Sequence, residues 1–340
     1  MTAPIIAFFN NKGGVGNTSL VYHLAWIYAE KGKRVIAVDL DPQSNLSSFF
    51  LSEKALEILW ENASEPNTTY RCIQPLIKGT GDILEPQLQE VELDGISVAL
   101  LAGDLALSQF EDDLATVWPE CADGRERAFR VVSAFWRIIQ LATTAYSADL
   151  VLIDMGPNLG SINRAVMIST DYVVIPLASD LFSVQGLRNL GPMLSKWRSQ
   201  WQQRQSKHQS ADFSIPDGDM QPIGYISMLH AERTSRPTLA YQKWLARIPT
   251  VYQTEILQQK QNKIASVTIE DDPNRIGTLK HYRSLMPMAQ EARKPIFFLK
   301  PADGVVGGHY YSVQDAYRDF KRLSESIQSR ITTLYRIVCK

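Results

Sequence analysis

Residues 8–19 read Phe-Phe-Asn-Asn-Lys12-Gly13-Gly14-Val15-Gly16-Asn17-Thr18-Ser19. An apolar run at 4–9 precedes this segment and predicts a strand, and an amphipathic stretch at 19–31 follows it and predicts a helix. Backbone N–H groups in such a glycine-rich turn converge on a phosphate, and the dipole of the following helix favours the negative charge. The segment therefore predicts a phosphate-binding loop in an α/β fold.

The end of this loop departs from the usual pattern G-x-x-x-x-G-K-[ST]. Asn17 stands where the pattern has lysine, while Thr18 follows in the position that binds Mg²⁺. Asparagine can donate a hydrogen bond but carries no charge. We therefore expect nucleotide binding with slow turnover, because charge grows on the transferring phosphoryl group.

Three aspartates end two further apolar runs. Asp39 and Asp41 close the run after Arg34, and Asp154 closes the run that begins at Asp149. The carboxyl ends of parallel strands meet where open α/β sheets bind ligands. One aspartate at a strand end is most often a cap or turn residue, but three of them beside a phosphate loop predict a magnesium–nucleotide site. Asp154 would hold Mg²⁺ through water, and of Asp39 and Asp41 one would support the cation while the other faces the γ-phosphate.

Strands alternating with helices along the chain predict a doubly wound, mostly parallel sheet flanked by helices. Further strands are predicted at 96–102, 172–177, 223–229 and 295–299, the last closing the set. Helices are predicted at 105–118, 125–145, 161–169, 235–246, 251–261 and 312–338. Residues 205–221 and 263–277 are predicted to be loops, and 50–95 resists assignment.

Composition is that of a globular cytoplasmic protein. The 340 residues are 45% hydrophobic and 21% charged, with a net charge of −1. The chain has no apolar run of transmembrane length, and its first residues enter a strand, so we expect neither a membrane span nor a signal peptide. Cys72, Cys121 and Cys339 show neither metal-ligand nor disulfide spacing, which fits a reducing compartment.

Three blocks of the sequence resemble the deviant Walker A ATPases of the ParA/MinD family. They are the Lys12-Gly-Gly-Val-Gly segment, Asp39-Leu-Asp41-Pro-Gln43, and Asp154-Met-Gly-Pro157-Asn-Leu-Gly. Weaker matches are Val174–Leu177 with Gly186-Leu187, Gly224–Met228 near the adenine, and Lys294–Pro301. The resemblance covers 4–50, 149–230 and 290–330. It implies one P-loop NTPase domain over 1–340 with insertions at about 51–148 and 230–290.

The resemblance also implies roles residue by residue. Lys12 matches the signature lysine, which reaches the partner's phosphates in an ATP-bound dimer, and Asp41 matches the residue that activates or positions water. The metal site is implied to be Thr18, Asp39 and Asp154. The implied nucleotide site is Lys12, Gly13, Gly14, Val15, Gly16, Asn17, Thr18, Ser19 and Met228.

The implied function is that of a cytoplasmic, nucleoid-associated partitioning ATPase. With ATP and Mg²⁺ it would form a homodimer, bind DNA non-specifically and position a plasmid, chromosome or protein cargo, and a ParB-like adaptor would stimulate hydrolysis. Asn17 is either an engineered change or a natural divergence in which Lys12 does more of the work. Two alternatives stay open: a nucleotide-dependent switch or scaffold with little hydrolysis, and a MinD-like membrane-positioning ATPase.

Two surfaces are candidates for partners. The segment 188–208 predicts a helix whose Leu/Trp stripe faces the core, and its DNA-binding candidates are Lys196, Arg204 and Lys207, against the alternative of a solvated helix face. A second basic set is Lys280, Arg283, Arg293 and Lys294. The stripe at Ile327, Ile331, Leu334 and Val338 predicts packing of the last helix on the body rather than on a membrane.

Overall fold

The structure is a computed structural model that describes residues 3–62, 65–229, 243–260, 267–280, 282 and 284–338, with side chains as far as residue 334. The part of the predicted helix 235–246 up to residue 242 lies outside the described residues. Arg283, Cys339 and the side chain of Val338 also lie outside them.

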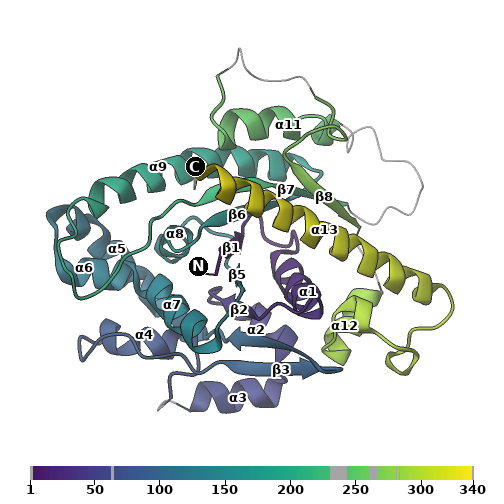
Figure 1. Cartoon of the computed structure of the whole chain (residues 1–340), viewed down its shortest axis with the longest axis horizontal. Coiled ribbons are helices and arrows are strands. Elements are labelled where there is room, and N and C mark those ends of the chain that lie inside the picture. The colour runs from purple at the N-terminus through teal and green to yellow at the C-terminus, as the bar shows by residue number, and fades with distance from the viewer. Residues whose placement is uncertain are drawn as a thin grey trace.

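One eight-stranded sheet forms the centre of the molecule (Figure 1). Only β3 and β4 pair antiparallel, and the other neighbours pair parallel. This confirms the predicted fold class, a mostly parallel P-loop NTPase sheet. In spatial order the strands are β3 (Gln89–Leu93), β4 (Ile96–Leu101), β2 (Val35–Asp39), β5 (Leu150–Asp154), β1 (Ile5–Phe8), β6 (Tyr172–Ala178), β7 (Gln221–Leu229) and β8 (Arg275–Lys280).

Helices cover both faces of this sheet. Figure 1 shows helices on both the left and the right of the central strands. One face carries α1 (Asn17–Glu30), α2 (Asn45–Phe50), α3 (Glu53–Glu61) and α13 (Gly308–Val338). The other carries α4 (Thr69–Ile77), α5 (Phe110–Glu120), α6 (Glu126–Val132), α7 (Ala134–Tyr146), α8 (Ser161–Ile168), α9 (Leu181–Gln205) and α11 (Ile248–Val251). α12 (Leu285–Ala292) belongs to a smaller cluster beside α13.

Short 3₁₀ and π turns join these elements. The 3₁₀ helices are η1 (Leu105–Gln109), η2 (Cys121–Asp123), η5 (Ile296–Phe298) and η6 (Pro301–Asp303), and a π-helix spans Tyr252–Ile256. The segment 51–148 supplies β3 and β4 to the sheet and α3 to α7 to its faces.

The central strands form because their runs are apolar throughout, and every residue of β1, β2 and β5 is buried. The helix after the phosphate loop differs from the amphipathic helix that the sequence predicts. Its residues 20–29 are all buried, because the sheet covers one side and α2 and α13 cover the others. A helix buried on all sides does not show a polar face.

Two predictions for the second half of the chain are wrong. Residues 295–299, predicted as the last strand, form the 3₁₀ turn η5, and the sheet instead ends at β8, within and just beyond the predicted loop 263–277. The predicted helix 125–145 is divided at Ser133, and 105–118 begins as a 3₁₀ turn. The stripe of Leu and Trp residues on α9 is buried, as predicted.

The side chain of Arg330 joins α13 to the edge of the sheet. Its guanidinium donates to the carbonyl oxygens of Ile223 at 2.7 Å, Pro273 at 2.6 Å and Arg275 at 3.0 Å, at the starts of β7 and β8. Ile327 and Ile331 of the same helix are buried on the sheet. The described part of the C-terminal stripe, Ile327, Ile331 and Leu334, therefore packs on the body, as predicted.

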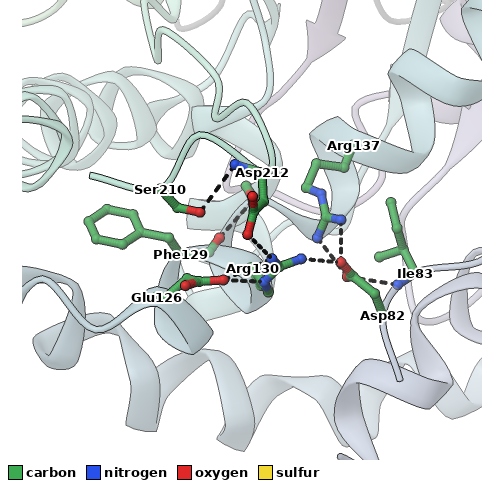
Figure 2. A network of polar contacts seen from close by, with 9 residues as sticks. Asp82, Ile83, Glu126, Phe129, Arg130, Arg137, Ser210 and Asp212 are labelled. Carbon is green, nitrogen blue, oxygen red and sulfur yellow. Dashed lines mark hydrogen bonds and ion pairs between the residues drawn. The ribbon is translucent and has the colours of Figure 1, made fainter. Parts of the chain in front are cut away.

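A polar cluster, which we call the Asp82 clamp, ties the loop after α4 to α6 and α7 (Figure 2). Asp82 accepts hydrogen bonds from Arg130 at 2.5 Å and from Arg137 at 2.6 and 2.8 Å. Arg130 also contacts Glu126 at 2.8 Å and Asp212 at 3.9 Å. Through Asp212 the cluster reaches the loop between α9 and β7.

Candidate nucleotide-binding site

The phosphate loop has the backbone conformation of an anion cradle. Gly14 and Gly16 have φ values of 74° and 94°, a left-handed conformation that side-chain-bearing residues rarely adopt. A Cβ placed on Gly14 would have no neighbour within 4 Å, so the turn borders open space at this residue. Gly16 is the N-cap of α1, so the free N–H groups of that helix face the same space.

The acidic residues meet beside this cradle because of strand register. Asp39 of β2 is paired with Asp154 of β5, and Phe8 at the end of β1 is paired with the same Asp154. Both carboxyls are almost completely buried. Neither oxygen of Asp154 accepts a hydrogen bond of full geometry within the described part of the chain, although the hydroxyl of Thr18 and the N–H of Met155 lie close enough to lower its pKa. A buried carboxylate with such weak donors is costly unless a cation or proton balances it.

Burial and mutual repulsion raise the pKa values of this pair. Burial, followed by the charge of Asp39, raises the pKa of Asp154 well above its usual range, and Thr18 offsets part of that rise. Burial, with a smaller contribution from Asp41, raises the pKa of Asp39 to about 7. Asp39 and Asp154 therefore resist ionisation beside the open cradle. A divalent cation bound there would favour their ionised forms and reduce the repulsion between them.

The two oxygens of Asp39 are already engaged. They accept from the backbone N–H of Ser47 at 2.8 Å, from its hydroxyl at 2.7 Å and from the N–H of Asp41 at 3.3 Å. Asp41 is only 7% exposed, and its carboxylate accepts a hydrogen bond from the N–H of Gln43 at 3.0 Å. Burial raises the pKa of Asp41. The carboxylate of Asp39 therefore holds the start of α2 in place, whereas the oxygens of Asp154 are available to a ligand.

These donors fit Mg²⁺ as part of a nucleotide complex. Among the described residues no group of three or more His, Cys, Asp or Glu side chains is placed to hold a metal alone. Mg²⁺ commonly keeps several waters and takes one or two carboxylates plus substrate phosphates. Thr18 and Asp154 are the side chains nearest to that requirement, with Asp39 as a neighbouring charge.

Asn17 and Thr18 form the first turn of α1. The side-chain oxygen of Asn17 is buried and has no hydrogen-bond donor among the described residues. The cradle thus has backbone donors and a neutral amide where the usual loop has an ammonium group. Ser19 follows on the same turn and its hydroxyl faces Met286 at 3.8 Å.

Lys12 is bound within its own chain. Its ammonium forms an ion pair with Asp180, the N-cap of α9, whose other oxygen accepts from the N–H of Ser183 at 2.8 Å. Burial alone would raise the pKa of Asp180, but the hydrogen bonds from Lys12 and Ser183 and the charge of Lys12 together outweigh burial, and the pKa is lowered. The ring of Phe182, 68% exposed, lies 5.8 Å from the same ammonium.

Sequence reasoning did not identify Asp180 or Asn10 as site residues. Asn10 is buried, donates to the carbonyl of Pro176 at 2.6 Å and accepts from the N–H of Lys12 at 3.0 Å. Asp180 could have been noticed as a helix cap, because Asp-Leu-Phe-Ser is a typical start of a helix. Its contact with Lys12 spans 168 residues, which no local pattern predicts.

A pocket of about 150 Å³ opens beside the cradle. Met228, which the sequence analysis placed near the adenine, lies on its wall, and the methyl carbon of Met228 is 3.4 Å from the position of a Cβ on Gly16. The remaining lining is mostly apolar. It comprises Gly14, Val15, Gly16, Ser19, Leu20, Ala178, Leu229, Leu279, Lys280, Tyr282, Met286 and Phe320.

The three DNA-binding candidates differ in whether their charged groups are free to contact a phosphate. Lys196 and Lys207 are exposed. Arg204 donates to the carbonyl of Trp118 at 3.0 Å and lies 4.3 Å above its ring, so its guanidinium is committed inside the protein. In the second basic set, Lys294 is paired with Asp303 at 2.8 Å.

A sequence model of a protein family, described as an AAA domain (AAA_31), matches residues 3–206, more than half of the chain. The chromosome partitioning protein ParA of Caulobacter vibrioides is 28% identical over 186 residues, which are 55% of this chain and 60% of that protein. For three further curated relatives the chain spans 55–62% of their length.

Solved structures show the same architecture. Protein DIP2308 from Corynebacterium diphtheriae is 26% identical, with a TM-score of 0.67 over 85% of this chain and 97% of that one. A putative plasmid partition protein from Borrelia burgdorferi, solved with bound AMPPNP, is 18% identical, with a TM-score of 0.57 over 96% of this chain and 99% of that one. The second likeness concerns the fold alone.

Proposed function

Because the chain belongs to the ParA/MinD family of P-loop ATPases, we propose that it binds ATP with Mg²⁺ and acts as a partitioning or positioning ATPase. The observation that carries this proposal is the carboxylate of Asp154, buried without a hydrogen bond of full geometry among the described residues and next to the open glycine cradle. Apolar packing alone does not account for such a group, whereas a nucleotide-bound cation does.

Each site residue then has a distinct task. The backbone N–H groups from Gly13 to Thr18 hold the phosphates, and the apolar pocket beside Met228 holds the base. Thr18 and Asp154 bind Mg²⁺, which would neutralise charge on the phosphates. Asp41, anchored by the N–H of Gln43, positions the attacking water.

Asn17 weakens both binding and turnover in this proposal. Loss of one charged hydrogen bond costs roughly 1.5–3 kcal/mol, or about 10–150-fold in affinity. The loss in hydrolysis is larger, about 10²–10³-fold, because the missing charge would act mainly on the transition state. Binding survives because the backbone cradle and the carboxylates are intact.

We further propose an ATP-dependent homodimer that binds DNA non-specifically and responds to an adaptor protein. In this dimer Lys12, whose ammonium is paired with Asp180 in the single chain, would exchange Asp180 for a phosphate of the partner's nucleotide. Support for DNA binding is limited to the exposed Lys196 on α9 and Lys207 just after it, since Arg204 is held by Trp118. The cell compartment that fits this role is the cytoplasm, with association to the nucleoid.

The proposal is tested by following ATP–Mg²⁺ binding by calorimetry, mass by light scattering and DNA binding by fluorescence anisotropy at two salt concentrations. Binding of ATP should double the mass and create salt-dependent DNA affinity. The double variant Lys196→Ala with Lys207→Ala should lose DNA affinity and lower the salt slope, whereas Lys33→Ala with Lys54→Ala, also exposed, should not. Absence of ATP binding would contradict the whole proposal, and unchanged DNA binding would remove the α9 surface from it.

A switch or scaffold with little hydrolysis is the second candidate, and Asn17 is the observation that favours it. The membrane-positioning alternative has no comparable support. Ile327 and Ile331 are buried against the sheet, and none of the helices in the described residues is both long and apolar enough to cross a bilayer.

A further inference from the structure

His23 is a buried polar residue of α1 to which neither the fold nor the phosphate site gives a role so far. Its Nε2 accepts the backbone N–H of Ile296 at 3.1 Å, so this nitrogen carries no proton. The proton is then on Nδ1, which donates to the carbonyl oxygen of Ser19 at 2.7 Å. Burial lowers the pKa of His23 to about 4, so the neutral ring persists at neutral pH. The imidazole thus links α1 to the turn η5.

Three wall residues of the pocket beside the phosphate loop rest on this imidazole, directly or through one contact. Phe320 of α13 stacks on it with ring centroids 4.7 Å apart and planes at 12°. The hydroxyl of Ser19 lies 3.3 Å from Nδ1, and the same hydroxyl lies 3.8 Å from the sulfur of Met286. Ser19, Met286 and Phe320 come from three different elements, α1, α12 and α13.

The wall that His23 supports suits a flat aromatic ring. Phe320 and the thioethers of Met228 and Met286 are polarisable groups that contact an aromatic ligand favourably. The pocket begins at Gly14 and Gly16, so a ligand that places phosphates in the cradle places its base here. Because the pocket is assembled from separate elements, its shape depends on whatever holds those elements together.

We propose that His23 is a positioning residue for the nucleobase, which sets the affinity for the base part of a nucleotide without touching it. The imidazole fixes Ser19 by a hydrogen bond and Phe320 by stacking, and it fixes η5 behind them through Ile296. This inference rests on the proposed nucleotide binding and adds the residue that shapes one end of that site.

The test compares two probes that differ only in the base and sugar. The affinities of Mg²⁺–ADP and of Mg²⁺–pyrophosphate are measured by calorimetry for the native chain and for His23→Phe. This variant keeps a ring to stack on Phe320 but removes both hydrogen bonds. ADP affinity should fall roughly three- to tenfold, the loss associated with a buried hydrogen bond, while pyrophosphate affinity should stay within about twofold.

Two further variants separate positioning from general stability. Tyr28→Phe removes another buried link between α1 and α13, the hydrogen bond to the carbonyl of Ser324 at 2.9 Å, away from the pocket. It should lower the melting temperature and leave both affinities unchanged. His23→Gln, which can still accept the N–H of Ile296, should lose less ADP affinity than His23→Phe and covers the case in which His23→Phe does not fold.

Equal losses for ADP and pyrophosphate, or unchanged ADP affinity in both His23 variants, would overturn the role of His23 while nucleotide binding stands. A native chain that binds neither probe would overturn the proposed function and this inference with it.

Discussion

Asn17 places a neutral amide at the start of α1, where a lysine would meet the β- and γ-phosphates. Its buried side-chain oxygen has no donor among the described residues, so nothing in the described structure requires asparagine at this position. We therefore predict that Asn17→Lys raises hydrolysis by about 10²–10³-fold and ATP affinity by about 10–150-fold. Steady-state phosphate release and calorimetry measure the two effects.

Asn17→Gln is the matched control, because it lengthens the side chain without adding charge. It should leave turnover within a few-fold of the native chain. Equal turnover in the lysine, glutamine and native proteins would show that charge at this position does not limit the reaction.

The buried pair Asp39 and Asp154 makes stability depend on pH and magnesium. Asp39 keeps its proton in the folded state up to a pH of about 7, whereas an unfolded chain loses it near 3.8. The stability that this group contributes is therefore present below about pH 4 and is lost as the pH rises to 7. We expect the contribution of Asp39 to the free energy of unfolding to fall by on the order of 4 kcal/mol across that interval without Mg²⁺.

Urea denaturation at pH 5 and pH 7.5, with and without Mg²⁺ and ADP, measures this dependence. Magnesium nucleotide should reduce the loss at pH 7.5, because it favours the ionised carboxylates. Asp39→Asn should flatten the pH profile, and a profile as steep as that of the native chain would assign the effect to other groups.

The sequence predicts those site residues whose positions follow from local patterns, such as the end of an apolar strand or a glycine turn. The glycines, Thr18, Asp39, Asp41 and Asp154 stand at strand ends or in a turn, and strand register then brings them together. Asp180, His23 and Phe320 could not be found in this way. Asp180 and Phe320 reach the site through tertiary packing across more than a hundred residues, and His23 gains its role from partners that are equally distant in sequence, Ile296 and Phe320. The sequence neighbourhoods of all three residues look like ordinary helix caps and core positions.

The Asp82 clamp acts between elements, joining the loop after α4 to α6, α7 and the loop after α9. Burial alone would raise the pKa of Asp82, but the hydrogen bonds from Arg137 and Arg130 lower it to about 2. Because the folded value is depressed, the stability is present above about pH 4 and is lost as the pH falls toward 2. We predict that Asp82→Asn costs about 1 kcal/mol at pH 7, since the group is partly exposed, and nothing below pH 2.

Chemical denaturation at pH 7 and at pH 3 checks the clamp. Asp94→Asn, which removes an exposed ion pair with Lys300, is the control and should have a smaller effect. If Asp82→Asn and Asp94→Asn behave alike, the two arginines do not act together on Asp82.

Helices and strands were predictable from the sequence where their apolar residues follow a single clear pattern, either a continuous run or a helical repeat. The apolar runs of β1, β2 and β5 and the Leu/Trp stripe of α9 are examples. β8 was missed because its sequence, Arg-Ile-Gly-Thr-Leu-Lys, is short, polar at both ends and does not alternate, since Ile276 and Leu279 are three residues apart. Residues 295–299 have strand-like composition, but His23 takes the N–H of Ile296 and the sheet already ends at β8, so this apolar segment packs as a turn instead.

For the molecule as a whole, Arg330 fastens the C-terminal helix to the starts of two strands. The carbonyl oxygens of Ile223, Pro273 and Arg275 all accept from this one guanidinium. Position 224 is glycine because an added Cβ would lie 2.4 Å from the carbonyl oxygen of Asn274 and 2.7 Å from the guanidinium. We predict that Arg330→Met lowers the free energy of unfolding by about 3 kcal/mol, because charged hydrogen bonds are lost and the carbonyls lose their donor.

Arg318→Met on the same helix is the control. Arg318 is exposed and pairs only with Asp315, three residues away, so its removal should cost less than about 0.5 kcal/mol. Similar midpoints of denaturation for the two variants would contradict a fastening role for Arg330.

The order of the strands has a consequence for how the chain is made. β1 lies between β5 and β6, so the earliest strand has no neighbour until residue 154 has left the ribosome and lacks its second neighbour until residue 178 has followed. At typical rates of translation this wait is on the order of ten to thirty seconds. During it the apolar segment 4–9 stays unpaired and open to chaperones, and a polypeptide cut short before β5 would carry the glycine turn without a neighbouring strand to hold it.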